Sequence, residues 1–127
     1  QLVMQHRKTG SEMFEYHAQV LLEMDRDFEA IKACQSAVLL NDSNAINWLT
    51  LSRAELNFGD PFQALKSISR AIELDFENDE IIEEYSAIYG ICNNLNEMKE
   101  KGKISDDVLK RRLIDRAHVL NQCECQQ

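Results

Sequence analysis

The chain has 127 residues, of which 44% are hydrophobic, and its 14 basic and 22 acidic side chains give a formal charge of −8. This length fits one domain with a sizeable core, and no apolar run approaches the ~20 residues of a membrane-spanning helix. The negative charge excludes a DNA-binding surface, because it would repel the phosphate backbone. One Pro and four Gly are too few for the frequent turns of a β-sandwich.

The four cysteines are sparser than those of a secreted disulfide scaffold. Cys34 and Cys92 fall inside apolar helical patterns, so we expect small core residues in a reducing compartment, the cytoplasm or the nucleus. The chain has no secretory signal and begins with Gln1 rather than Met. We therefore expect it to be an excerpt of a longer protein.

The predicted elements start with Leu2 to His6, which we expect to end the helix of a preceding unit, with a turn at 8–10. Two helix pairs come next, over 11–24 with 27–40 and over 44–58 with 61–74. In the second pair Gly59 suits a helix end that needs a positive φ. Asp60 is the predicted N-cap of the next helix, with Pro61 at its first position.

A period of 34 residues relates the two pairs. A shift by 34 places Phe14 on Trp48 and Phe28 on Phe62. The same shift aligns further residues: Ala30 with Ala64, Ala37 with Ala71, and the N-cap candidates Asn44 with Asn78. The aligned alanines are expected at close helix contacts, where a larger side chain would hold the helices apart.

A third unit starts at Asn78 with an apolar stripe that reaches Cys92. From Asn93 to Gly102 the polar sequence either prolongs this helix or forms a longer connection. A helix over 105–121 is then predicted as the delayed partner or a capping helix, with 122–127 as a flexible tail. Its expected buried face comprises Val108, Leu109, Leu113, Ile114, Ala117 and Leu120.

This pattern resembles the tetratricopeptide repeats. The shared features are the period of 34 and these residues: Phe14, Trp48, the Gly59-Asp60 turn, Phe28, Phe62, Ala64 and Ala71. The resemblance implies an all-α, right-handed helical solenoid of antiparallel helix pairs with a C-terminal capping helix. We expect one domain over 1–127, with repeats at 11–44 and 45–78 and a divergent third repeat plus capping helix at 79–121.

The sequence departs from the family's pattern at four positions. Ser52 and Ala18 stand where the family usually has Gly, and Phe76 and Asp42 stand where it usually has Pro.

The resemblance also implies that the first helix of each pair lines a concave groove, which receives an extended peptide or a partner helix. By periodicity the expected lining residues are Glu12, Glu15, Tyr16, Gln19 and Glu23 from the first unit, Ile46, Leu49, Thr50, Arg53 and Asn57 from the second, and Glu80, Glu83, Glu84 and Ala87 from the third.

Chaperone-binding members of the family grip a C-terminal carboxylate with Lys, Asn and Arg side chains. The matching positions here hold Glu15, Gln19, Thr50, Glu80 and Glu84. An acidic chaperone tail would be repelled, so the expected partners exclude it.

Acidic residues crowd positions 75–84, whereas basic residues gather near the end: Lys99, Lys101, Lys103, Lys110, Arg111, Arg112 and Arg116. One interpretation is two ordinary solvated faces. Another is a groove that selects a basic or apolar-basic segment, with charge steering its approach. A third is that the basic C-terminal helix folds against the acidic face of its own or another copy.

The remaining candidates for chemistry are weak. His17, one turn from Phe14 and Leu21, is expected to pack between repeats. His118, Cys123 and Cys125 form the sole metal-like cluster, and they lack the fourth ligand and the spacing of a zinc site. The sequence has no Gly-rich phosphate loop and no nucleophile motif. We therefore predict no catalytic, cofactor or metal site.

The predicted function is a non-enzymatic protein–protein interaction module, an adaptor or scaffold subunit of an assembly. Its expected partner is a protein or peptide, with no direct nucleic-acid contact and no membrane. The alternative is a structural self-association module, in which an unfinished solenoid end stacks on another copy.

Overall fold

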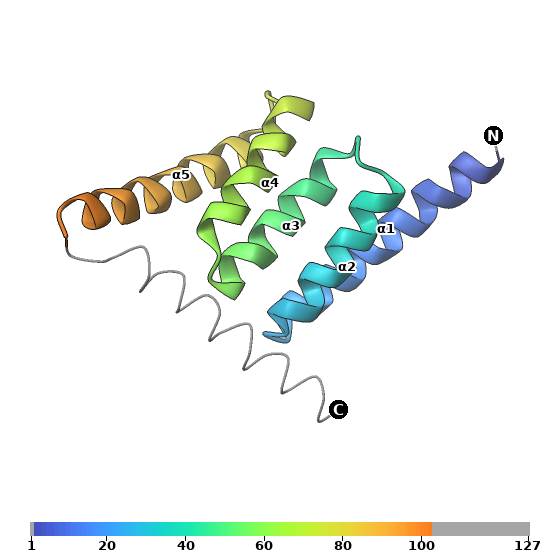
Figure 1. Ribbon diagram of the computed structural model, residues 1–127. Helices are drawn as coiled ribbons and strands as arrows, with labels where there is room; N and C mark the ends of the chain where they lie inside the picture. The colour runs from blue at the N-terminus through green and yellow to red at the C-terminus, as the bar shows by residue number, and fades with distance from the viewer. Residues whose placement is uncertain (1, 103–127) are drawn as a thin grey trace.

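The computed structural model describes residues 2–102, with side chains from residue 10 onward. Its five α-helices are α1 (Leu2–Glu23), α2 (Asp27–Leu40), α3 (Ala45–Phe58), α4 (Pro61–Leu74) and α5 (Asp79–Glu100). Figure 1 shows α1 with α2 and α3 with α4 as successive antiparallel pairs, followed by α5 beside α4. Residues 2–102 contain no strand. The described part is thus an all-α helical solenoid, as predicted.

The predicted helix boundaries follow from local hydrogen bonding. Three side-chain caps accept backbone N–H groups: Asn44 from Ile46 at 3.0 Å, Asp60 from Gln63 at 3.2 Å, and Asn78 from Glu80 at 3.0 Å. These bonds satisfy donors that the first helical turn leaves without partners. Gly59 ends α3 with φ 104°, a conformation that glycine adopts without a side-chain clash. The predicted caps and the predicted glycine are confirmed.

The prediction of a turn at 8–10 was wrong, because α1 is continuous from Leu2 to Glu23. One glycine costs a helix only about 1 kcal/mol, which a helix of 22 residues can tolerate. Gly10 also lies close to α2: a Cβ at this position would be 3.3 Å from Leu40 Cδ1. Leu2 to His6 therefore belong to the same helix as the first repeat.

The stretch from Asn93 to Gly102 prolongs the third-unit helix, which was the first of the two alternatives. α5 continues to Glu100, and Gly102 lies just beyond it in the left-handed region with φ 72°. The predicted helix over 105–121, the tail over 122–127 and the His118, Cys123 and Cys125 cluster lie outside the described residues. The division into repeats stays a prediction.

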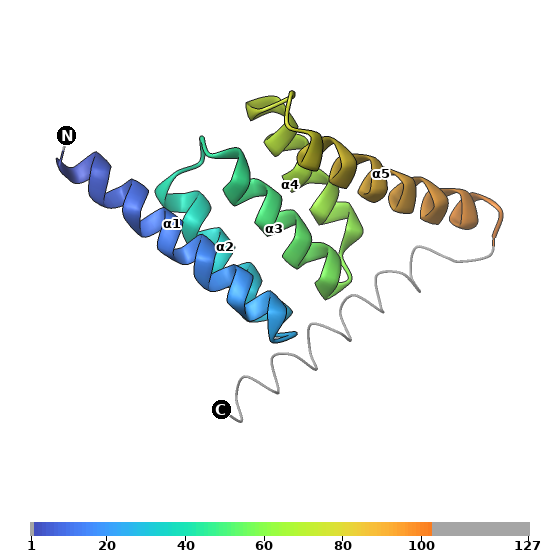
Figure 2. The ribbon, with the colours of Figure 1, turned by 180° about the vertical axis from the view of Figure 1, so that it is seen from behind.

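The core consists of two apolar clusters along the solenoid. The first joins α1 and α2 to α3, and the second joins α3 and α4 to α5; Trp48 packs against both. Ala30, Ala37, Ala64 and Ala71 are fully buried, in line with their predicted place at close helix contacts. These clusters hold each helix against the next one in the chain. The alternate helices α1, α3 and α5 lie together on one side of the molecule (Figure 2).

Candidate functional site

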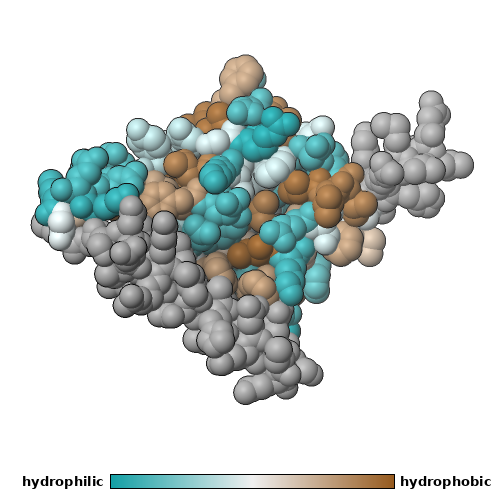
Figure 3. Space-filling view, in the orientation of Figure 1, coloured by the Kyte–Doolittle hydropathy of each residue, from teal (hydrophilic) through white to brown (hydrophobic). Residues whose placement is uncertain are grey.

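A groove of about 640 Å³ lies between α1, α3 and α5, on the side seen in Figure 2. Its lining residues are Glu15, Gln19, Leu22, Glu23, Asp25, Ile46, Leu49, Thr50, Arg53, Asn57, Glu80 and Glu84. The residues of each helix recur three or four positions apart, so that they share one helix face. The other side of the molecule, shown in Figure 3, mixes hydrophilic and hydrophobic side chains.

Most of the predicted groove residues lie in this groove. The residues placed there are Glu15, Gln19, Glu23, Ile46, Leu49, Thr50, Arg53, Asn57, Glu80 and Glu84. Their role in binding a partner stays a prediction.

Four predicted residues do not line the groove: Glu12, Tyr16, Glu83 and Ala87. Tyr16 and Glu83 are each one residue, about 100° of helix rotation, away from Glu15 and Glu84, and Tyr16 is 65% exposed. Glu12 lines a separate cavity with Asn44 and Asp75. The structure therefore places these four residues outside the groove lining.

Two lining residues were missed, Leu22 and Asp25. Leu22 lies three residues after Gln19 and seven after Glu15, so the helical spacing could have identified it. Asp25 lies just past the end of α1 in the left-handed region, with φ 57°. No helical spacing could have placed it, because its position depends on the turn into α2.

The groove is acidic and contains one cation that already has partners. Its lining carries five carboxyl groups and one guanidinium, a formal charge of 1 − 5 = −4. Arg53 Nη2 lies 2.7 Å from Glu80 Oε1, and its Nε lies 3.6 Å from Glu84 Oε1. Such partly exposed ion pairs contribute little to stability, typically about 0–1 kcal/mol. They do hold the α5 carboxyl groups against α3.

Glu15 forms part of the floor of the groove. Its side chain is buried, and its Oε1 accepts hydrogen bonds from Thr50 Oγ1 at 2.7 Å and from Gln19 Nε2 at 2.5 Å. A buried carboxyl group is tolerated when donors satisfy its oxygens. The Thr50 bond therefore ties α1 to α3 and fixes the spacing of these two groove helices.

A second buried carboxyl group, Glu55, lies between α3 and α4. Its Oε1 accepts a hydrogen bond from Ser67 Oγ at 2.5 Å. Burial, helped by the charge of Asp60 and opposed by bonds from Ser67 and Gln63, raises the pKa of Glu55 to about 7. This group is thus a candidate for titration near neutral pH.

The two described cysteines are buried free thiols, as predicted. Burial, together with the charges of Glu15 and Glu55, raises the pKa of Cys34 to about 12. Burial and then Asp60 also raise the pKa of Cys92, whose Sγ donates a hydrogen bond to the Pro61 carbonyl at 3.2 Å. Thiols with raised pKa values are poor nucleophiles and poor metal ligands.

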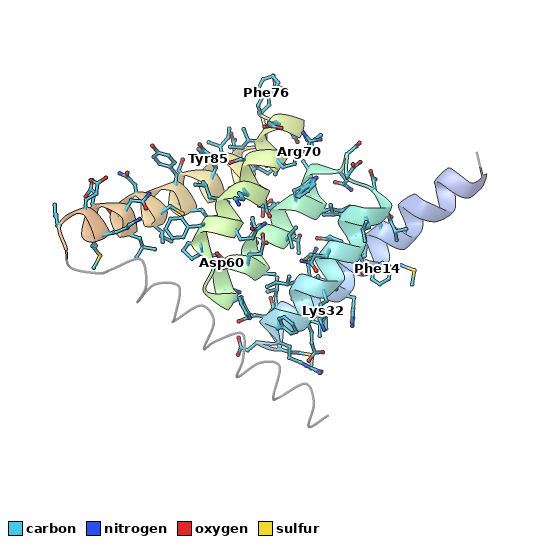
Figure 4. The ribbon with its side chains drawn as sticks, viewed as in Figure 1. Phe14, Lys32, Asp60, Arg70, Phe76 and Tyr85 are labelled. Carbon is cyan, nitrogen blue, oxygen red and sulfur yellow. The ribbon has the colours of Figure 1, made fainter. Side chains whose placement is uncertain are left out.

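The prediction that His17 packs between repeats was wrong. Its side chain is exposed and lines a shallow recess of about 310 Å³ between α1 and α2, with Phe14 and Lys32 among its neighbours. Figure 4 shows these two neighbours at the α1–α2 end of the molecule. α1 is the outermost helix of the described part at this end, so His17 lies on an end face.

Among the described side chains, those of residues 10–102, no group of three or more His, Cys, Asp or Glu is placed to bind a metal ion. None of the helices over residues 2–102 is long and apolar enough to cross a membrane.

No protein-family model matches the chain. Over 72 residues it is 33% identical to tetratricopeptide repeat protein 33 of Homo sapiens and 32% identical to that of Xenopus laevis. The aligned region covers 57% of this chain, and the chain spans 28% of the length of these curated relatives. The likeness to this protein, suggested also by the run from Trp48 to Leu56, is thereby confirmed.

A solved structure shares the fold. It is the second tetratricopeptide-repeat domain of Spaghetti (RPAP3), bound to the HSP90 peptide SRMEEVD. The match has a TM-score of 0.70 at 16% sequence identity, and it covers 81% of this chain and 94% of that one. Together with the curated relatives, it confirms the resemblance drawn from the 34-residue period.

Proposed function

We propose that this chain, a tetratricopeptide-repeat solenoid, is a non-enzymatic protein-interaction module that binds a basic or apolar-basic segment in its groove. The observation that carries the proposal is the charge of the groove. The groove lining holds five carboxyl groups and one guanidinium, and that guanidinium already contacts Glu80 and Glu84. A segment with Lys or Arg side chains would relieve this unbalanced charge, while Ile46 and Leu49 offer apolar contacts.

The same charge argues against an acidic ligand. The similar Spaghetti domain is bound to a peptide that ends in Glu-Glu-Val-Asp. In this chain such a tail would meet Glu15, Glu80 and Glu84, and like charges placed together weaken binding. We infer that the groove discriminates against carboxylate tails, so that its partners differ from chaperone tails.

The role of the protein in the cell is inferred from the kind of site, which is a binding groove. A binding groove without a catalytic constellation suits an adaptor or scaffold subunit, which brings two proteins together. The buried free thiols of Cys34 and Cys92 support an intracellular, reducing location, the cytoplasm or the nucleus.

The test is a titration of the chain with two fluorescent peptides, one of alternating Lys and Leu residues and one of sequence SRMEEVD. We expect the basic peptide to bind more tightly. Glu80→Lys combined with Glu84→Lys should weaken its binding at least about tenfold, ~1.4 kcal/mol, because two attractive charges become repulsive. Fluorescence anisotropy measures both affinities.

The matched control is Glu77→Lys combined with Glu83→Lys. This variant makes the same change in net charge on exposed residues outside the groove lining. Its affinity for the basic peptide should stay close to that of the parent chain. Equal losses in the two variants would mean that net charge, and not the groove, attracts the peptide.

Self-association is a second candidate, supported by an exposed end face on α1. Met13 is 68% exposed, and Val20 and Met24 are each 55% exposed. The positions 34 residues later lie in α3 and are Asn47, Ala54 and Phe58, which face the first repeat. Asn47 and Ala54 are buried, and the Phe58 ring lies 5.9 Å from the Phe28 ring. α1 thus offers a stacking face to another copy.

Light scattering over a concentration series distinguishes the two functions, since stacking predicts a mass that rises with concentration.

A further inference from the structure

Two pairs of exposed carboxyl groups lie on the groove side of the molecule. Glu23 and Asp25 line the groove where α1 ends and turns into α2, and we call them the turn pair. Glu12 and Asp75 line the second cavity, of about 520 Å³, and we call them the loop pair because Asp75 begins the loop after α4. Among residues 10–102, no Lys, Arg or His side chain forms an ion pair with any of these four carboxyl groups.

The other carboxyl groups of the groove already have partners. Glu15 accepts hydrogen bonds from two neutral side chains, and Glu80 and Glu84 lie beside Arg53. The negative charge that a ligand can still neutralise is therefore concentrated in the turn pair and the loop pair.

The two cavities adjoin each other, and the two pairs lie at opposite edges of the solenoid. Ile46 lines both cavities and is 38% exposed. In Figure 1 the loops after α2 and α4 lie at one edge, and the turns after α1 and α3 lie at the other. A segment that follows the groove from edge to edge would therefore pass the loop pair, then Ile46, and then the turn pair.

The distance between the two pairs is set by α1. Glu12 and Glu23 are 23 − 12 = 11 residues apart in this helix, which corresponds to about 17 Å. Hydrogen bonds from Asn47 to Ser11 and from Thr50 to Glu15 hold α3 against α1 over this length. An extended segment advances about 3.3 Å per residue, so about five residues would cover the distance.

We propose that the groove recognises an extended segment with two basic residues about five positions apart, one at the loop pair and one at the turn pair, with an apolar side chain against Ile46 between them. This inference rests on the proposed function and narrows it, because the spacing of the basic residues then selects the partner. Two adjacent basic residues would have to share one pair and would leave the other pair without a cation.

Two peptides of equal composition, KLSLSK and LSKKSL, test the spacing. The lysines are five positions apart in the first peptide and adjacent in the second, and blocked ends keep the charge and the length equal. We expect KLSLSK to bind the full chain about fivefold more tightly, the effect of one additional exposed ion pair. Fluorescence anisotropy of the labelled peptides measures both affinities.

Conservative substitutions show whether both pairs are used. Glu23→Gln with Asp25→Asn neutralises the turn pair, and asparagine tolerates the left-handed conformation of residue 25, with φ 57°. Glu12→Gln with Asp75→Asn neutralises the loop pair. Each variant should weaken the binding of KLSLSK about fivefold, whereas LSKKSL should respond to only one of them.

The matched control is Glu77→Gln with Glu83→Gln, which removes two exposed negative charges outside both cavities. It should leave the affinity for KLSLSK unchanged. A loss equal to that of the other two variants would mean that the overall charge attracts the peptide, and it would overturn the proposal.

The outcomes separate this inference from the proposed function. Equal binding of KLSLSK and LSKKSL overturns recognition at two pairs and leaves the groove function standing. A response of KLSLSK to one neutralising variant alone also overturns it, because one lysine then makes no contact with its pair. If neither peptide binds to the parent chain, the proposed function fails, and this inference fails with it.

Discussion

Two buried polar side chains on α3, Asn47 and Glu55, form hydrogen bonds to neighbouring helices. Apolar contacts alone would not fix the register between these helices. Asn47 Nδ2 donates to Ser11 Oγ at 2.6 Å and to the Asn41 carbonyl at 3.0 Å, so it connects α3 to α1 and to the end of α2. Glu55 makes the corresponding link to α4 through Ser67. Directional bonds of this kind specify one register between packed helices, where apolar contacts tolerate several.

Glu55 should make stability depend on pH. Its folded-state pKa of about 7 lies above the ordinary value of 4.5, so between these values the folded state holds a proton that the unfolded state has lost. Stability therefore falls as pH rises from about 4.5 to 7, by at most about 3 kcal/mol. Urea unfolding at pH 5 and pH 8 should show this loss in the parent chain and a smaller one in Glu55→Gln.

The control for this substitution is Glu73→Gln, which changes an exposed carboxyl group on α4. It should keep the pH dependence of the parent chain. If Glu55→Gln also keeps it in full, the titration of Glu55 does not control stability in this range.

At the scale of elements, glycines have opposite roles according to their place in a helix. Gly59 ends α3 in the left-handed region and allows the immediate start of α4, whose N-cap Asp60 is the next residue. Figure 4 shows Asp60 at this corner. Gly90 lies inside α5, where an added Cβ would have no heavy atom within 4 Å.

Gly59→Ala and Gly90→Ala should therefore change stability in opposite directions. Alanine at Gly59 must adopt φ 104°, at a cost of about 1–2 kcal/mol. Alanine at Gly90 should stabilise α5 by up to about 1 kcal/mol. Thermal unfolding followed by circular dichroism measures both changes, and a stabilising Gly59→Ala would contradict the role assigned to this turn.

At the scale of the whole molecule, charge is unevenly distributed. The chain carries a formal charge of −8, and the groove lining alone carries −4. The concave side therefore has a negative field that would attract a basic segment before contact, and a long-range field of this kind raises the association rate more than it lowers the dissociation rate.

The association rate of the basic peptide should then fall with ionic strength. Raising salt from about 0.1 M to 1 M shortens the Debye length from about 10 Å to about 3 Å, which screens the groove from an approaching peptide. Stopped-flow anisotropy should show a large drop in the association rate and a small change in the dissociation rate. Rates that do not respond to salt would exclude electrostatic steering.

The sequence by itself determined α2, α3 and α4, the caps at Asn44, Asp60 and Asn78, and the general direction of the groove face. These features depend on local rules: apolar residues three and four apart, an Asn or Asp before a first turn, and a Gly where φ is positive. The predictions over 27–40 and 61–74 agree with α2 and α4 for this reason. The turn predicted at 8–10 failed because a Gly within a helix and a Gly after a helix look alike in a sequence.

Only the tertiary structure decided which polar residues are buried and which groove residues meet. Glu15 and Glu80 both appear as surface acids in the sequence, yet Glu15 lies in the floor of the groove with Thr50, whereas Glu80 lies at its edge with Arg53. The length of α5 was also undecided by the sequence, since the stretch 93–102 could have been a helix or a connection. These features depend on contacts between residues far apart in the chain, and local periodicity carries no information about such contacts.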